Sequence, residues 1–267
     1  MAPLVWLLVV LANPAAAGGE PTEAPAEQAP AAAPDLYQLH LAVDLPVTVV
    51  AGSAGLARVL FEDQLARKSC PCDPSSVNAL DRHAIGNHSA AASIAANVTV
   101  YGVMGALPLA DLLDVGWGRT WGEDMVVYAE TIAVDTALQN AANFIVARPR
   151  PRTYAGDPEF LNSGEGYVSF YAGHVSTAFA TLSMAAFTIR HRHGEHVWPW
   201  IVAGLLGASV GVERVASGHH FPTDVAAGAV AGTAIGITIP WLHLRRSRSP
   251  LALTAMAGHG LGLTGAF

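Results

Sequence analysis

The stretch Arg214-Val-Ala-Ser-Gly-His-His-Phe-Pro-Thr-Asp224 decides how this chain is interpreted. Pro222 is typical of the first turn of a helix, where its missing N–H is not needed, and the small apolar residues after it predict that a helix begins there. His220 and Asp224 are four residues apart, so they can share one face of the helix start. The carboxylate can then hold one imidazole nitrogen and leave the other free for a substrate. The stretch therefore predicts a nucleophilic histidine.

The composition is that of an apolar, acidic protein. Of the 267 residues, 52% are hydrophobic and only 13% are charged, against about a quarter in ordinary soluble domains. The formal net charge is −7, and no basic tract is present, which excludes nucleic acid as an expected partner. Arginine supplies 13 of the 14 basic residues, so Lys68 is the only lysine.

The N-terminal region has the pattern of a targeting segment followed by a linker. An apolar run over residues 3–12 precedes small residues that resemble a cleavage site, which predicts a signal peptide over 1–17. Since the first residues carry no Lys or Arg, an uncleaved N-terminal anchor is the alternative. Residues 18–34 are rich in Pro, Ala and Glu and predict a flexible linker.

Six apolar segments predict an all-α, six-helix bundle over residues 35–243, embedded in a membrane. They cover roughly 41–61, 91–113, 124–147, 174–189, 197–213 and 223–243, and each approaches the length of a membrane span. Residues 62–87 are interpreted as a loop whose function the sequence does not indicate. Its Cys70 and Cys72 are too close in sequence for an easy disulfide and too few for a zinc site. The tail, 244–267, is Arg-rich and then apolar and Gly-rich, and it is either strand-like or disordered.

The charges predict an orientation but leave a conflict. Arginines at 190, 192, 245, 246 and 248 lie at the ends opposite to the motif, so the positive-inside rule puts the motif on the outer, periplasmic face of a bacterial inner membrane. Counting back through six spans then puts the linker in the cytoplasm, which contradicts a cleaved export signal. Asp44 and Arg58 in the first segment, and Glu130, Asp135 and Gln139 in the third, are costly in lipid. Either the first segment does not span, or the N-terminal run is an anchor, or the protein is a soluble periplasmic helical domain.

Two further stretches complete a recognisable pattern. The first runs from Asn143 to Arg150-Pro151, and the second is Ser169-Phe-Tyr-Ala-Gly173-His174. With the Arg214 stretch, the chain resembles the type 2 phosphatidic acid phosphatase/vanadium haloperoxidase superfamily. The family pattern is Lys, six residues, Arg-Pro, then Pro-Ser-Gly-His, then Ser-Arg, five residues, His, three residues, Asp. The resemblance covers roughly residues 91–243 and implies a phosphatase of the acid or lipid phosphatase type.

The resemblance also implies a role for each matching residue. Arg150 and Arg214 would hold the phosphoryl group with their planar forks, and Gly173 would let backbone N–H groups approach the anion at a helix start. His220, oriented by Asp224, would attack phosphorus and form a phosphohistidine. His174 would protonate the leaving alcohol, and water would then release phosphate. No metal or other cofactor is expected, because the arginines and amides supply the charge stabilisation.

Several positions depart from the family pattern. Asn143 stands where the family has lysine, Ala172 and Tyr171 stand in place of serine and proline, and Glu213 precedes Arg214. Asn143 can still donate a hydrogen bond to phosphate, and Arg148 or Arg152 could restore the missing charge. These two arginines have no motif position, so headgroup contact and plain surface are both open. The Asn97-Val-Thr sequon lies in an apolar segment and is interpreted as meaningless.

The expected function is hydrolysis of a phosphomonoester or pyrophosphate, on a phosphorylated lipid at the membrane. The family also includes phosphatases of undecaprenyl pyrophosphate, phosphatidylglycerophosphate and lipid A, and the sequence does not choose among them or fix the oligomeric state. One alternative is a catalytically impaired, lipid-phosphate-binding pseudo-enzyme, which the losses at Asn143 and Ala172 favour. Another is a vanadium-dependent haloperoxidase with His220 as the vanadate ligand.

Overall fold

The computed structural model describes residues 35–245, 252–256 and 260–264. The predicted signal peptide or anchor, 1–17, and the linker, 18–34, lie outside the described residues. So do Arg246 and Arg248, on which part of the orientation argument depends.

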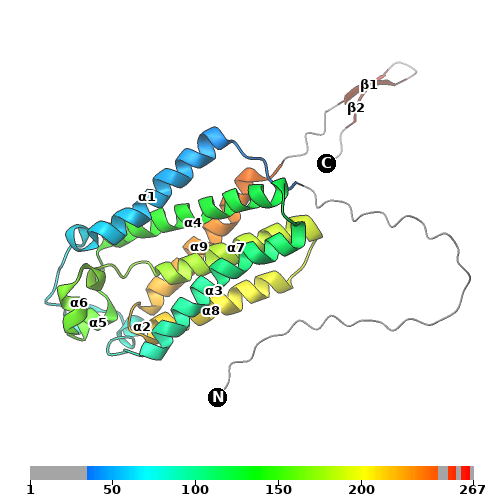
Figure 1. Ribbon diagram of the computed structural model, residues 1–267. Helices are drawn as coiled ribbons and strands as arrows, with labels where there is room; N and C mark the ends of the chain where they lie inside the picture. Colours follow the sequence, from blue (N-terminus) through cyan, green and yellow to red (C-terminus); the bar gives the residue numbers. More distant parts are fainter. Residues whose placement is uncertain (1–34, 246–251, 257–259, 265–267) are drawn as a thin grey trace, which may run out of the picture. The chain divides into compact units, whose positions relative to one another are not determined.

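Within the described residues, six long helices form the fold, as the sequence predicted (Figure 1). They are α1 (Leu41–Leu65), α3 (Ala90–Val115), α4 (Arg119–Val146), α7 (Gly173–His193), α8 (Trp198–Ala216) and α9 (Pro222–His243). Short helical turns connect them: η1 (Pro74–Ser76), α2 (Ala79–Arg82), α5 (Pro151–Tyr154), α6 (Pro158–Asn162) and η2 (Gly164–Tyr167). In the tail, β1 (Ala252–Met256) and β2 (Gly260–Thr264) pair antiparallel, which corresponds to the strand-like alternative.

The predicted loop between the first two long helices is more structured than expected. It contains η1 and α2, and Cys70 and Cys72 form a disulfide within it. The expectation that these cysteines are too close to pair is therefore wrong. The single residue between them lets the chain bend so that the two Cα atoms lie 4.5 Å apart, which is within the range of disulfides.

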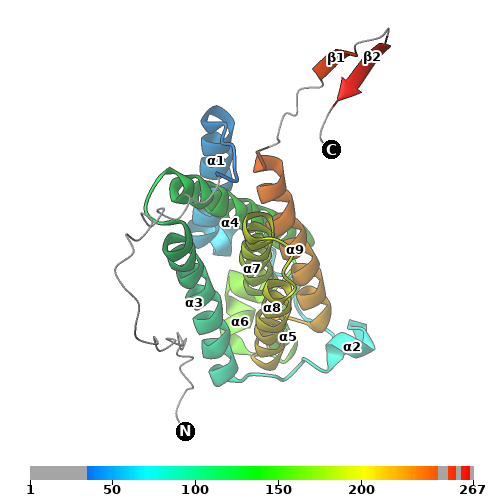
Figure 2. The ribbon, with the colours of Figure 1, turned by 90° about the vertical axis from the view of Figure 1, so that its right-hand side faces the viewer.

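Helix α7 is the centre of the bundle and contacts α3, α4, α8 and α9 (Figure 2). Its closest neighbour is α9, because glycines at every fourth position of α9 let the two backbones touch. Gly228, Gly232 and Gly236 face the carbonyl groups of residues 172, 176 and 180, and a Cβ at Gly228 would lie 2.7 Å from the first of these oxygens. Small residues at this spacing are typical of tightly packed membrane helices. We call these three residues the glycine stripe.

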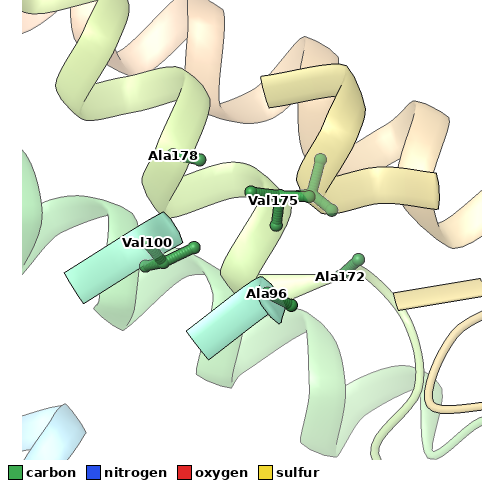
Figure 3. Close-up of a cluster of buried hydrophobic side chains, with 6 residues drawn as sticks. Ala96, Val100, Ala172, Val175 and Ala178 are labelled. Carbon is green, nitrogen blue, oxygen red and sulfur yellow. The ribbon is translucent and has the colours of Figure 1, made fainter. Parts of the chain in front are cut away.

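A cluster of small and β-branched side chains fixes α7 against α3 and α8 close to the start of α7 (Figure 3). Its members are Ala96, Val100, Ala172, Val175, Ala178 and Val210, and all are at most 3% exposed. Since buried groups of this size leave little freedom for the helices to shift, the cluster holds the N-terminus of α7 in place.

The outer surface of the bundle is apolar. Four helices, α1, α3, α8 and α9, are long and apolar enough to span a membrane, and most residues of their most apolar windows face outward. Exposed valines and leucines cover α1 in particular. A large apolar surface of this kind is stable in lipid and a liability in water, so the structure supports a membrane location.

Candidate active site

The three sequence motifs meet at one end of the bundle, where α2, α5 and α6 lie (Figure 1). They contribute the loop after α4, the N-terminus of α7 and the turn between α8 and α9. In this turn the backbone N–H groups of His219 and His220 both donate to the Arg214 carbonyl. Gly218 has a φ of +70°, and a Cβ there would collide with the carbonyl of Asn87, so the turn requires glycine.

The two motif arginines are almost fully buried, each 4% exposed, but they differ in their partners. Arg150 donates through Nε to the Glu165 carbonyl (2.7 Å) and through one terminal nitrogen to the His219 carbonyl (3.2 Å). The guanidinium of Arg214 has no hydrogen bond or ion pair among the described residues, and its Nε is buried without a partner. A buried, unpaired cation is costly, so Arg214 has the environment of a group that binds an anion.

His220 is positioned as a neutral imidazole, but not by the contact that the sequence predicted. Its Nδ1 lies 2.8 Å from the carbonyl oxygen of Ser169 and 4.0 Å from the carboxylate of Asp224. Because a carbonyl can only accept, Nδ1 carries the proton and Nε2 keeps its lone pair. Burial, and then the charges of Arg150 and Arg214, lower the pKa of His220 well below its usual value. The ring therefore stays unprotonated and nucleophilic.

Asp224 acts on His220 through Ser169. The carboxylate accepts hydrogen bonds from the Ser169 hydroxyl (2.6 Å) and the Phe221 backbone N–H (3.0 Å). The carbonyl of the same serine accepts the hydrogen bond from His220. Asp224 therefore holds Ser169 in place, and Ser169 orients the imidazole ring. The direct contact between Asp224 and His220 that the spacing predicted is replaced by an indirect one, through the backbone of Ser169.

Arg148 and Asp81 form the outer part of this arrangement, and the sequence analysis missed both roles. Arg148 donates to Asp224 (2.5 Å) and to the fully buried Asp81 (2.8 Å), and its guanidinium lies over the ring of Phe221. It is therefore neither a headgroup contact nor a free surface charge. Arg152 pairs with Asp157 and a second acid on the loop. Neither arginine replaces the missing lysine.

His174 begins the central helix and is oriented from α3. Its Nε2 lies 2.8 Å from the side-chain oxygen of Asn97, and the edge of its ring faces Tyr101. The amide oxygen can only accept, so this nitrogen carries a proton. Asn97, which belongs to the sequon interpreted as meaningless, is thus placed to hold the expected general acid.

The position of the missing lysine is occupied in an unexpected way. Asn143 is completely buried and donates both amide hydrogens to the carbonyls of Phe170 and Tyr171, so its donors are turned away from an incoming phosphate. Its oxygen accepts instead from Arg58 of α1 (3.1 Å), which also donates to Asn140 (3.1 Å).

Arg58 supplies a third positive charge at this end of the bundle. Burial is the main cause that lowers the pKa of Arg150, and the charge of Arg58 lowers it further. The second terminal nitrogen of Arg58 has no hydrogen bond among the described residues. A basic residue inside a predicted apolar span was the only sequence sign of this role.

The remaining predicted residue, Gly173, is needed for packing. It is the first residue of α7, and a Cβ there would lie 2.8 Å from the side-chain amide carbon of Gln139 on α4. Ala172 is fully buried in the cluster described above, and its N–H donates to the Asp224 carbonyl (3.1 Å). Ala172 therefore offers a phosphate neither a hydroxyl nor a free backbone N–H, so it does not replace the hydrogen-bond donor of the family serine.

Comparisons with known proteins match the segment that carries the three motifs. The family model of the PAP2 superfamily matches residues 124–248, which include all seven predicted site residues. The chain is 29% identical over 137 residues, 51% of its length, to a lipid A 1-phosphatase of Porphyromonas gingivalis. It is 36% identical over 73 residues, 27% of its length, to the bacitracin transport permease protein BcrC of Bacillus licheniformis. These matches cover 27% and 32% of the two relatives.

No solved structure matches the chain significantly. The family match, the motif spacing and the six-helix fold agree with one another. Over residues 124–248, this chain matches the PAP2 superfamily.

Proposed function

We propose that this protein is a lipid phosphatase that hydrolyses a phosphomonoester or pyrophosphate through a phosphohistidine on His220. One observation carries the proposal. The guanidinium of Arg214 is buried and has no partner within the described residues, and the same turn presents a neutral His220 whose Nε2 is free. An anion at this position would pair the arginine and place an electrophilic phosphorus near the nucleophile.

In the first step, Nε2 of His220 forms a bond to phosphorus as the bond from phosphorus to the leaving oxygen breaks. Burial and the charges of Arg214 and Arg150 lower the pKa of His174 to about 3 in the free protein, and a bound phosphate offsets these charges so that the ring takes up a second proton. The imidazolium then gives its Nδ1 proton to the leaving oxygen, while its Nε2–H keeps the hydrogen bond to Asn97. In the second step, His174 removes a proton from water, which attacks phosphorus and breaks the N–P bond. Arg58, Arg150 and Arg214 balance the negative charge on the phosphoryl oxygens.

A lipid substrate is supported by the apolar outer helices and by the likeness to a lipid A 1-phosphatase. An outward-facing site is supported by two features. Arg190 and Arg192 lie at the opposite end of the bundle, and the Cys70–Cys72 disulfide lies in the segment that leads to α2, at the end of the site. Disulfides persist in oxidising compartments, so we propose that the site faces the periplasm. The signal peptide and its cleavage remain predictions.

The test is phosphate release from a panel of lipid phosphates and pyrophosphates, with wild type, His220→Gln and His88→Gln. His88 is an exposed loop histidine and serves as the matched control. We expect His220→Gln to lose about 10³-fold or more in kcat, because the nucleophile acts as a unit with its partners. Wild type given ³²P-labelled substrate should form an acid-labile, alkali-stable phosphoprotein, and the variant should not.

Two other results would replace the proposal. Tight binding of lipid phosphates without any turnover would identify the pseudo-enzyme that Ala172 favours. Halide oxidation that depends on added vanadate, without phosphate release, would identify a haloperoxidase. Equal phosphate release by wild type and His220→Gln would show that the reaction does not use this histidine.

A further inference from the structure

A second cluster of ionisable side chains lies where α1 begins and α9 ends, at the opposite end of these helices from the proposed phosphate site. Asp44 is in the first turn of α1, Glu130 is in α4, and His243 is the last residue of α9. Their exposures are 5%, 6% and 7%, so all three are withdrawn from solvent. Nothing in the proposed phosphatase chemistry uses them.

The side chains converge on a common point. Nδ1 of His243 lies 2.9 Å from the carbonyl oxygen of Ile239, which can only accept, so a neutral ring turns the lone pair of Nε2 toward the two acids. This nitrogen is 3.5 Å from an oxygen of Asp44 and 3.3 Å from Oε2 of Glu130. Oε2 is buried and has no hydrogen-bond partner, so its approach to the ring is not a hydrogen bond.

The charge of the cluster is not balanced by the protein. Within the described residues, no arginine or lysine pairs with Asp44 or Glu130, and the only other polar contact to either carboxylate is the backbone N–H of His40 at 2.6 Å from Asp44. With both carboxylates ionised beside a neutral imidazole, the cluster would carry a charge of −2, which is costly at the edge of a membrane. A divalent cation would neutralise both acids.

We propose that Asp44, Glu130 and His243 bind one divalent transition-metal cation and so join α1, α4 and α9. One atom from each residue lies within 4.8 Å of the others. Bonds of about 2.0–2.1 Å in a tetrahedral zinc site separate neighbouring ligand atoms by about 3.3–3.4 Å, which matches the distances from Nε2 to the two carboxylates. The bond from Nδ1 to a backbone carbonyl is also the usual support of a metal-bound histidine.

The competing account is a protonated His243 that pairs with the acids. An imidazolium would neutralise one of the two carboxylates and would favour N–O distances of about 2.7–2.9 Å, shorter than those observed. Metal content separates the two accounts, because only one of them predicts stoichiometric binding.

The experiment uses the full chain in detergent, purified through a streptavidin-binding tag because a polyhistidine tag would bind metal itself. Wild type, His243→Gln, Glu130→Gln and His191→Gln are equilibrated with Zn²⁺, passed through a desalting column and analysed for metal by mass spectrometry. His191 is the matched control, since its Nδ1 bonds the carbonyl four residues earlier in the same way. Thermal unfolding of wild type is measured with Zn²⁺ and with a chelator.

We expect about one zinc per chain in wild type and in His191→Gln, and at least fivefold less in the other two variants. The Tm of wild type should fall by several degrees with chelator, a readout that does not depend on the stability of any variant. Wild type that retains no zinc and has the same Tm with or without it would overturn the proposal. Equal zinc in wild type, His243→Gln and Glu130→Gln would do so as well.

Discussion

Replacing Arg58 tests whether a residue from α1 has taken over the charge of the missing lysine. We predict that Arg58→Gln lowers kcat by about 10²-fold. Removing one preorganised donor at a developing anion costs about 10²–10³ in rate. The lower end applies here, because Glu62 lies 2.7 Å from Nε and offsets part of the charge, and because the side chain is 20% exposed. The loss corresponds to about 2.7 kcal/mol of transition-state stabilisation.

The assay is steady-state phosphate release in detergent micelles, with Tm recorded for each variant. Arg67→Gln is the matched control. Arg67 lies two residues after the end of α1, is exposed and donates to a backbone carbonyl. Arg58→Lys should recover only part of the rate, since lysine restores the charge without the planar fork. Activity of Arg58→Gln within threefold of wild type, at an unchanged Tm, would refute the reasoning.

A second substitution sharpens this test. Asn143→Lys restores the family residue, but in wild type it would put a cation against Arg58 and remove the oxygen that holds it. We therefore expect Asn143→Lys to lower activity in wild type and to raise it in the Arg58→Gln background. Effects of the same sign in both backgrounds would show that the two residues do not share one function.

Three further predictions follow from single contacts. Arg148→Gln should lower kcat by about 10-fold with KM nearly unchanged, since it releases Asp224 without removing a group proposed to contact phosphate. A rise in KM as large as the fall in kcat would contradict this. Asn97→Leu should shift the basic limb of the pH profile of kcat to lower pH, because the imidazolium of His174 loses its acceptor; an unmoved profile would exclude that role. Gly232→Ala should destabilise the fold by about 1–3 kcal/mol in thermal unfolding, because its Cβ would collide with the α7 backbone. Gly105→Ala is the control, since a Cβ there meets no other atom, and it should not destabilise the fold. Equal effects of the two substitutions would contradict the packing argument.

The helices and motif positions could be predicted from the sequence because their signals are local. The segment expected over 91–113 is α3, Ala90–Val115, and the segment expected over 223–243 is α9. Apolar runs of span length need no knowledge of their neighbours. The convergence of Arg150, His174 and His220 was expected from the family resemblance, which implies that the three motifs form one site.

The contacts that complete the site could not be predicted, because they join residues far apart in the chain. Arg58 meets Asn143 across 85 residues, and Asn97 meets His174 across 77. The four-residue spacing of His220 and Asp224 suggested a direct contact, but the backbone of Ser169 lies nearer to the ring. Local spacing fixes which side chains can meet, and tertiary packing decides which ones do.

The glycine stripe has a consequence for how this protein responds to bilayers of different thickness. His174 and His220 stand at the starts of α7 and α9, whose backbones touch along their length, so hydrophobic mismatch cannot easily separate them. Helix α1 is the most lipid-exposed of the candidate spans, with 6% of its window buried, and it can tilt at lower cost. Changes in acyl-chain length should therefore displace Arg58 first and leave the two histidines in register.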